Sequence, residues 1–253
     1  MSAGEKNRYF HNVNDLDPEL SASLLRWGLA LADTKYLLGR RLSEWVNGAP
    51  ALEAAVGAAA MTQDELGHAR SLYSFLRDFP GAPEELGTEF DLLRTEFFSP
   101  VALENPMRNW SDVVASNVLF DRALNILFEA TRGSQFGPLA QRAAKILQEE
   151  SFHRIFGDSW LARLARSDGK QRKILEKSLE SAWSLADAWI GPSDDPTTGS
   201  LVEAGILTAS PAELRERWLA QVNPLLAKHG LYRSMPEPDW ERWNADRRDI
   251  SHG

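Results

Sequence analysis

The stretch ALEAAVGAAAMTQDELGHARSLYSFLRDF, residues 51–79, carries Glu65 and His68 three positions apart. The stretch KILQEESFHRIFGDSW, residues 145–160, repeats this spacing with Glu150 and His153. With 20 glutamates and five histidines in the chain, chance alone gives about 0.4 such Glu-x-x-His spacings. Residues i and i+3 lie on one face of a helix. Each motif therefore presents a carboxylate and an imidazole to the same point.

Further helices flank these two stretches. Helical periodicity begins after Asp17 and Pro18, since Asp can cap a helix and Pro fits its first turn, and it continues to about residue 45. Gly48 and Pro50 end that helix. The pattern predicts the other helices over 51–79, 111–130, 137–167, 171–190 and 211–228.

The remaining segments are predicted to connect these helices. Residues 80–109 contain four prolines and are expected to form a crossover with one or two short helices, whereas 191–200 reads as a loop. No segment shows the alternation of a strand. The chain is therefore predicted to be all-α, with the order of a ferritin-like four-helix bundle, a long crossover between its second and third helices, and extra C-terminal helices. We expect an N-terminal arm over 1–16, the helical domain over 17–230, and a polar, loosely held tail over 231–253, in which Trp240 and Trp243 indicate a docking contact.

Composition excludes several classes of protein. The formal net charge of −8 disfavours a nucleic-acid binder or a protein of anionic membranes. The absence of cysteine excludes disulfide scaffolds, iron–sulfur clusters and thiolate zinc sites. No apolar run reaches the roughly 18–20 residues of a membrane span, and the first residues lack the apolar core of a signal peptide. We expect a cytoplasmic protein.

Two further acids lie in apolar surroundings. Asp33 lies in LALADTKYLL of the first predicted helix, and Asp121 lies in NVLFDRALNILF of the third. A lone buried charge is costly unless it is paired or coordinated. Two Glu-x-x-His faces joined by one carboxylate from each other helix form a di-iron or di-manganese cage. The predicted metal ligands are Asp33, Glu65, His68, Asp121, Glu150 and His153. The alternative is structural: each motif is a solvent-facing or hydrogen-bonded pair, Asp33 hydrogen-bonds a neighbouring helix, and Asp121 pairs with an arginine.

The two motif stretches also resemble a known family. TQDELGHARSLYSFL (62–76) is similar to the second-helix motif of the ferritin-like oxygenase subunits of phenylacetyl-CoA epoxidase, and KILQEESFHRIFGDSW is similar to their fourth-helix motif. That family has a catalytic A-type with a di-iron centre and a C-type scaffold that has lost the ligands. Its catalytic type has Glu as the ligand of the first helix. A gapless match from Trp45 puts Lys35 there, and Asp33 fits with a shift of two residues.

The resemblance implies a di-iron monooxygenase subunit of phenylacetate catabolism, with two iron ions or manganese in their place. It would use O₂ and electrons from a separate reductase to oxidise an aromatic acyl-CoA, paired with a related ferritin-like subunit or a second copy. One alternative is a non-catalytic scaffold subunit of the same complex. Another is an unrelated di-metal protein, such as a ferroxidase or a manganese catalase.

Overall fold

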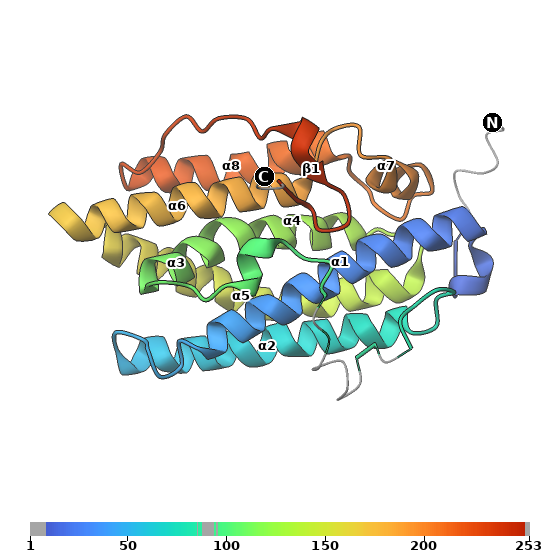
Figure 1. Cartoon of the computed structure of the whole chain (residues 1–253), viewed down its shortest axis with the longest axis horizontal. Coiled ribbons are helices and arrows are strands. Elements are labelled where there is room, and N and C mark those ends of the chain that lie inside the picture. Colours follow the sequence, from blue (N-terminus) through green and yellow to red (C-terminus); the bar gives the residue numbers. More distant parts are fainter. Residues whose placement is uncertain (1–8, 85, 88–93, 95, 251–253) are drawn as a thin grey trace.

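The first half of the bundle is a pair of long helices. The computed structural model describes residues 9–84, 86–87, 94 and 96–250. Helix α1 (Pro18–Ser43) lies against α2 (Leu52–Leu76) along much of their length (Figure 1). Asp17 caps α1 by accepting a hydrogen bond from the backbone N–H of Leu20 at 2.8 Å, and Pro18 occupies the first turn. The start predicted from these two residues is confirmed.

The second half follows the crossover. A short 3-10 helix, η4 (Val101–Glu104), precedes α3 (Trp110–Ala115), the π-helix η5 (Ser116–Asp121), α4 (Arg122–Thr131) and α5 (Gly137–Ala165). The sequence predicted one helix over 111–130; the path is helical, but a π turn interrupts it. Helix α5 lies very close to this turn at Gly157. A Cβ atom on that residue would lie only 1.8 Å from Oδ1 of Asn117. π turns in helices are frequent at functional sites.

Three helices cover one side of the bundle. Helix α6 (Gly169–Ile190) and α8 (Pro211–Lys228) lie side by side, and α7 (Pro196–Glu203) lies near the N-terminal half of α1 (Figure 1). The loop predicted over 191–200 is wrong in its second half, where α7 begins. Asp195 starts this helix by accepting a hydrogen bond from the backbone N–H of Thr197 at 3.0 Å.

The C-terminal segment packs against the bundle rather than being loosely held, and Trp243 makes a docking contact by donating from Nε1 to the carbonyl of Ala188 at 2.8 Å. After η6 (Trp240–Arg242), strands β1 (Trp243–Asn244) and β2 (Asp249–Ile250) pair antiparallel. The side chain of Arg248, only 1% exposed, donates to the carbonyls of Trp189 and Ile190 at the end of α6 and pairs with Asp195 at 3.0 Å. These bonds satisfy helix-end carbonyls that would otherwise lack partners. At the other terminus, η2 (Val13–Asp15) precedes α1, and residues 1–8 of the predicted arm lie outside the described residues.

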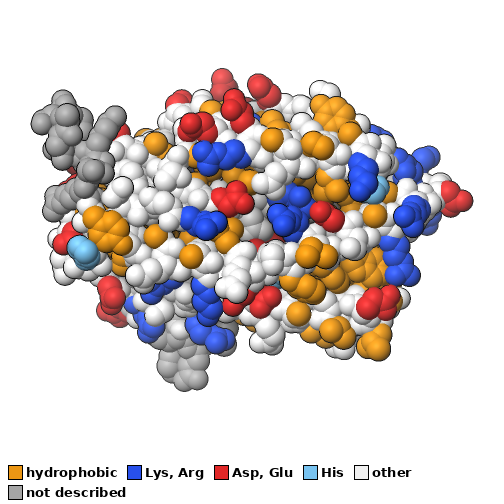
Figure 2. All heavy atoms as spheres, turned by 180° about the vertical axis from the view of Figure 1, so that it is seen from behind, with side chains coloured by type: hydrophobic (Ala, Val, Ile, Leu, Met, Phe, Trp, Pro, Cys, Tyr) orange, Lys and Arg blue, Asp and Glu red, His pale blue; other side chains and the backbone are white. Residues whose placement is uncertain are grey.

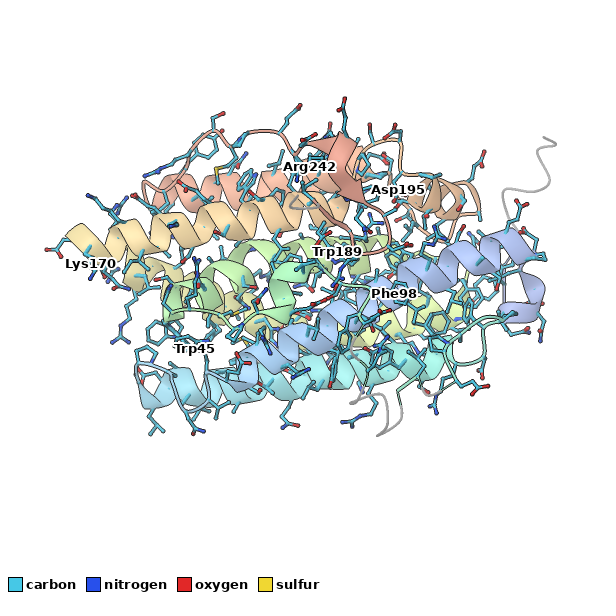
Figure 3. All side chains as sticks on the ribbon, in the orientation of Figure 1. Trp45, Phe98, Lys170, Trp189, Asp195 and Arg242 are labelled. Carbon is cyan, nitrogen blue, oxygen red and sulfur yellow. The ribbon has the colours of Figure 1, made fainter. Side chains whose placement is uncertain are left out.

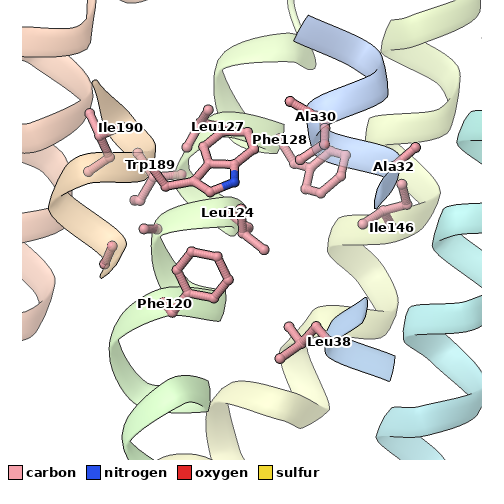
Figure 4. Close-up of a cluster of buried hydrophobic side chains, with 14 of the residues drawn as sticks. Ala30, Ala32, Leu38, Phe120, Leu124, Leu127, Phe128, Ile146, Trp189 and Ile190 are labelled. Atoms are coloured by element: carbon pink, nitrogen blue, oxygen red, sulfur yellow. The ribbon is translucent and has the colours of Figure 1, made fainter. Parts of the chain in front are cut away.

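The core runs through the middle of the bundle. Buried apolar side chains of α1, η5, α4, α5 and α6 meet there; Figure 4 labels Ala30, Ala32, Leu38, Phe120, Leu124, Leu127, Phe128, Ile146, Trp189 and Ile190. The buried indole of Trp189 donates to the hydroxyl of Thr34 at 3.0 Å, so its polar atom is satisfied. The fold is an all-α, ferritin-like bundle, as the helix order predicted. No helix within the described residues is both long and apolar enough to cross a membrane.

Candidate functional site

The two Glu-x-x-His motifs face each other inside the bundle. Glu65 and His68 lie on α2, and Glu150 and His153 lie on α5; all four side chains are buried. The imidazole rings are 6.5 Å apart between centroids. Asp121, at the end of the π turn, brings a third carboxylate to the same point, with its Oδ2 3.3 Å from Nδ1 of His153. The structure therefore brings together five of the six predicted site residues.

The sixth predicted residue, Asp33, does not join them. Its carboxylate accepts hydrogen bonds from the hydroxyl of Tyr73 at 2.7 Å, from Arg94 at 2.5 Å and from the backbone N–H of Phe98 at 2.7 Å. Figure 3 shows Phe98 beside α1, where the crossover returns to the bundle. Burial raises the pKa of Asp33, and the Arg94 guanidinium opposes that rise. Asp33 anchors the crossover, so its position does not match the predicted ligand of the first helix; the alternative of a structural hydrogen-bonding role does.

Lys35 takes the place expected for Asp33. Its Nζ lies 2.6 Å from Oε1 of Glu150, 2.8 Å from Oδ1 of Asp121 and 3.0 Å from Oε2 of Glu65, and its side chain is fully buried. Positions 33 and 35 differ by about 200° around a helix, so only one of them can face the bundle interior. The interior stripe of α1 is Leu24, Leu31, Leu38 and Leu42, with Lys35 in register between them. That heptad spacing is the signal in the sequence that identifies Lys35 as an interior residue.

The charges of this cluster compensate one another. Burial lowers the pKa of Lys35, but the attraction of Asp121, Glu150 and Glu65 outweighs it and holds the pKa well above the usual 10.5. Burial also lowers the pKa of His153, yet its hydrogen bonds to Asp121, Glu150 and Glu65 raise it far above 6.5. Burial raises the pKa of Glu150, while Lys35 and the histidines bring it well below 4.5. Burial leaves the pKa of Glu65 raised despite Lys35.

The outer nitrogens of the histidines are held by acids of the opposite helix. Nε2 of His68 lies 2.9 Å from Oε2 of Glu149 on α5, and Nε2 of His153 lies 3.3 Å from Oδ2 of Asp64 on α2. Such carboxylate–histidine pairs fix the orientation of metal-binding imidazoles in metalloproteins. The two acids precede the motif glutamates directly in the sequence, so the crossed pairing follows from bringing two copies of one motif face to face.

The donor set of the cluster fits a metal centre only in part. Glu65, Asp121, Glu150 and His153 each offer a ligand atom within 4.8 Å of one another, and this buried group is compatible with a metal site. The cluster does not fit two irons, because helix α1 supplies Lys35 where a carboxylate ligand is needed. A charged lysine has three donors and no acceptor, so Lys35 cannot coordinate a cation, and its ammonium lies among the carboxylates that would do so.

A small polar cavity of about 90 Å³ adjoins the cluster at Asp121 and Glu150. Asn125 lines it and donates from Nδ2 to Oε2 of Glu150 at 3.2 Å. Glu129, two turns beyond Asp121, also lines the cavity but does not belong to the cluster of potential ligands found among the described residues.

Comparison with known proteins agrees with this architecture. A family model described as "Phenylacetic acid catabolic protein" matches residues 9–252. The chain belongs to the phenylacetic acid catabolic protein family. Two curated members from Escherichia coli strain K12 are similar to it. The C subunit of 1,2-phenylacetyl-CoA epoxidase is 29% identical over 203 residues, which is 79% of each chain. The A subunit of the same enzyme is 28% identical over 197 residues, which cover 77% of this chain and 62% of that relative.

The two identities are too close to assign this family member to either type. The family match and both relatives support membership of a phenylacetate-catabolic oxygenase complex with partner subunits. The residues at the ligand positions are therefore what can distinguish an A-type from a C-type subunit.

Proposed function

We propose that this chain is a non-catalytic, ferritin-like subunit of a phenylacetyl-CoA epoxidase-type complex. It would support a catalytic A-type relative, which would carry the metal and the oxidation of the aromatic acyl-CoA. One observation carries the proposal: the Lys35 ammonium lies within 3.0 Å of three carboxylates that would otherwise hold metal. It supplies the positive charge that those carboxylates require inside a protein.

The cluster would then be a structural polar core. Lys35 links the three other helical segments of the bundle through Glu65 on α2, Asp121 on η5 and Glu150 on α5. A buried polar network favours one arrangement of the helices around it, although Oε2 of Glu65 and Nδ1 of His68 have ion-pair contacts without a hydrogen bond among the described residues. In this chain the two Glu-x-x-His motifs would then fix the helices of the bundle relative to one another rather than hold metal ions.

An exposed apolar surface supports a role in an assembly. Leu52 and Val56 on α2 are 79% and 62% exposed, and Ile155 on α5 is 63% exposed. Phe156 packs against Gly57, so the two helices adjoin at this surface. Apolar side chains gather toward one end of the molecule in Figure 2. Contiguous exposed apolar patches are typical of contacts with other proteins.

The rival function is a two-iron monooxygenase in this chain itself, which five of the six predicted ligands favour. It requires Lys35 to leave the cluster or lose its proton. Both changes are costly, because the ammonium is fully buried against three carboxylates.

Reconstitution separates the two functions. The chain, an A-type relative and a reductase are purified separately, and oxidation of phenylacetyl-CoA, with O₂ and the electron donor of that reductase supplied, is followed by mass spectrometry. We expect no product from the chain with reductase alone, a complex with the relative on gel filtration, and faster turnover by that complex than by the relative alone. Product from the chain and reductase alone, abolished by His153→Ala, would contradict the proposal, as would failure to form any complex.

A further inference from the structure

The outer face formed by α2 and α5 has two halves that occupy equivalent positions. The helices run antiparallel: Arg163 near the end of α5 lies 3.3 Å from Glu53 near the start of α2, and Arg142 near the start of α5 donates to the carbonyl of Ser71. The two Glu-x-x-His motifs that face each other lie 85 positions apart in the sequence. A position on α2 and the position 85 residues later on α5 are therefore related by an approximate two-fold axis between the motifs.

The two halves of this face differ in polarity. In one half, Val56 and Ile155 are 62% and 63% exposed. The equivalent positions of the other half carry Gln141 and Arg70, which are exposed as well. Both pairs lie on the outer side of the same two helices, so packing within the bundle requires an apolar side chain at neither pair. The apolar residues at the first pair therefore indicate a contact outside the chain.

Neighbouring apolar side chains extend that surface. Leu52 and Phe152 are also exposed. The rings of Phe152 and Phe156 lie 6.1 Å apart between centroids, and Phe156 packs against Gly57, so α2 and α5 touch beneath the surface. Apolar side chains gather in Figure 2 at the end of the molecule where α2 begins in Figure 1. The apolar half of the face is defined by four exposed side chains: Leu52, Val56, Phe152 and Ile155.

The charges around the apolar half balance one another. Glu53 and Arg163 at its rim are one acid and one base. Asp64 at its border contacts His153 at 3.3 Å. A surface that meets an identical copy across a two-fold axis cannot carry an excess of one sign, because like charges would then face each other. The apolar half meets this condition although the whole chain has a formal net charge of −8, and it offers no excess charge by which a partner of opposite sign would recognise it.

We propose that the apolar half of the α2/α5 face binds a second copy of this chain in a two-fold contact. The four exposed apolar side chains of each copy pack against those of the other and are removed from water, which is the main driving force for such association. The proposal goes beyond the function proposed above, since pairing of two copies requires neither metal nor an A-type relative.

Sedimentation velocity of the full chain, at concentrations between about 1 and 200 µM, measures this association. We expect a dimer whose dissociation constant changes little between low and high NaCl, because apolar contacts rather than exposed ion pairs hold it. Val56→Glu combined with Ile155→Glu should weaken dimerisation about a hundredfold or more, because a two-fold contact buries each new charge twice. Gln141→Glu combined with Arg70→Glu, the matched changes in the polar half, should leave the dissociation constant unchanged.

Circular dichroism establishes that both double variants are folded. If the variant of the apolar half does not fold, Val56→Gln combined with Ile155→Arg replaces it, since these are the residues found at the equivalent positions of the polar half. A wild-type chain that is monomeric over the whole range would overturn the proposal, as would a dimer that both double variants weaken equally. A monomeric wild type that binds an A-type relative through Val56 and Ile155 would also overturn it, while leaving the proposed function intact.

Discussion

Replacing Lys35 by Met removes the ammonium and keeps an unbranched apolar stem in the bundle. The three carboxylates of Glu65, Asp121 and Glu150 then face one another without that cation. At an effective dielectric constant near 20, each contact of about 2.8 Å represents a gross attraction of roughly 6 kcal/mol. Desolvation of the ions offsets most of it, and removing one partner of a buried pair costs about 3–5 kcal/mol net. For a chain of this length, about 4 kcal/mol corresponds to a fall in Tm of roughly 8–16 °C.

Circular dichroism during thermal and guanidinium unfolding measures this loss, with Lys170→Met, at an exposed position of α6, as the control. The deficit of Lys35→Met should shrink between pH 7 and pH 5. Without the lysine, the folded-state pKa values of the carboxylates rise above their unfolded values, so the folded variant takes up protons and gains stability as the pH falls. A Lys35→Met protein as stable as wild type at pH 7, or a deficit that is the same at both pH values, would refute the role assigned to Lys35.

Three further outcomes follow from other contacts. The pKa of His153 lies above its unfolded value of 6.5, so its stabilisation is complete below pH 6.5 and declines by about 1.4 kcal/mol per pH unit above it; His153→Gln should remove that slope from urea unfolding measured between pH 7 and 9. Arg248→Ala should cost about 3 kcal/mol or more, because the buried Asp195 carboxylate loses its cation and keeps only its hydrogen bonds from Thr197 and Thr198. The exposed Arg242→Ala, compared by the same unfolding assay, should cost little. Asp33→Ala should expose the crossover to limited proteolysis, whereas undiminished protection would contradict its anchoring role.

Much of the bundle could be predicted from local signals. Asp17 with Pro18 set the start of α1 correctly, and Pro211 set the start of α8. The π turn Ser116–Asp121 was not predicted, because its apolar spacing does not differ locally from that of the α-helix on either side. Likewise, the C-terminal segment is polar in sequence, and its burial depends on Arg248 reaching carbonyls some 59 residues earlier.

The sequence also predicted part of the candidate site: the residues from α2 and α5, but not the one from α1. The paired motifs gave the contributions of α2 and α5, because i and i+3 spacing is a property of one helix. The rotation of α1 about its axis is set by tertiary partners. Arg94, 61 residues beyond Asp33, holds that acid at the crossover, and the opposite face carries Lys35 into the bundle. The leucine stripe places Lys35 on the interior face of α1, and the gapless match from Trp45 places it at the ligand position of the first helix. Asp33 was predicted instead because a metal ligand there must be an acid.

Iron stoichiometry shows whether the Lys35 ammonium excludes metal from the carboxylate cluster. Wild type and Lys35→Glu are incubated anaerobically with excess Fe(II), desalted, and measured by inductively coupled plasma mass spectrometry, with Lys170→Glu as the surface control. Lys35→Glu replaces the buried ammonium by a carboxylate at the position on α1 where a metal ligand is missing. We expect no stoichiometric iron in wild type or in the control, and one or two irons per chain in Lys35→Glu. Two irons per wild-type chain, retained through desalting, would contradict this expectation.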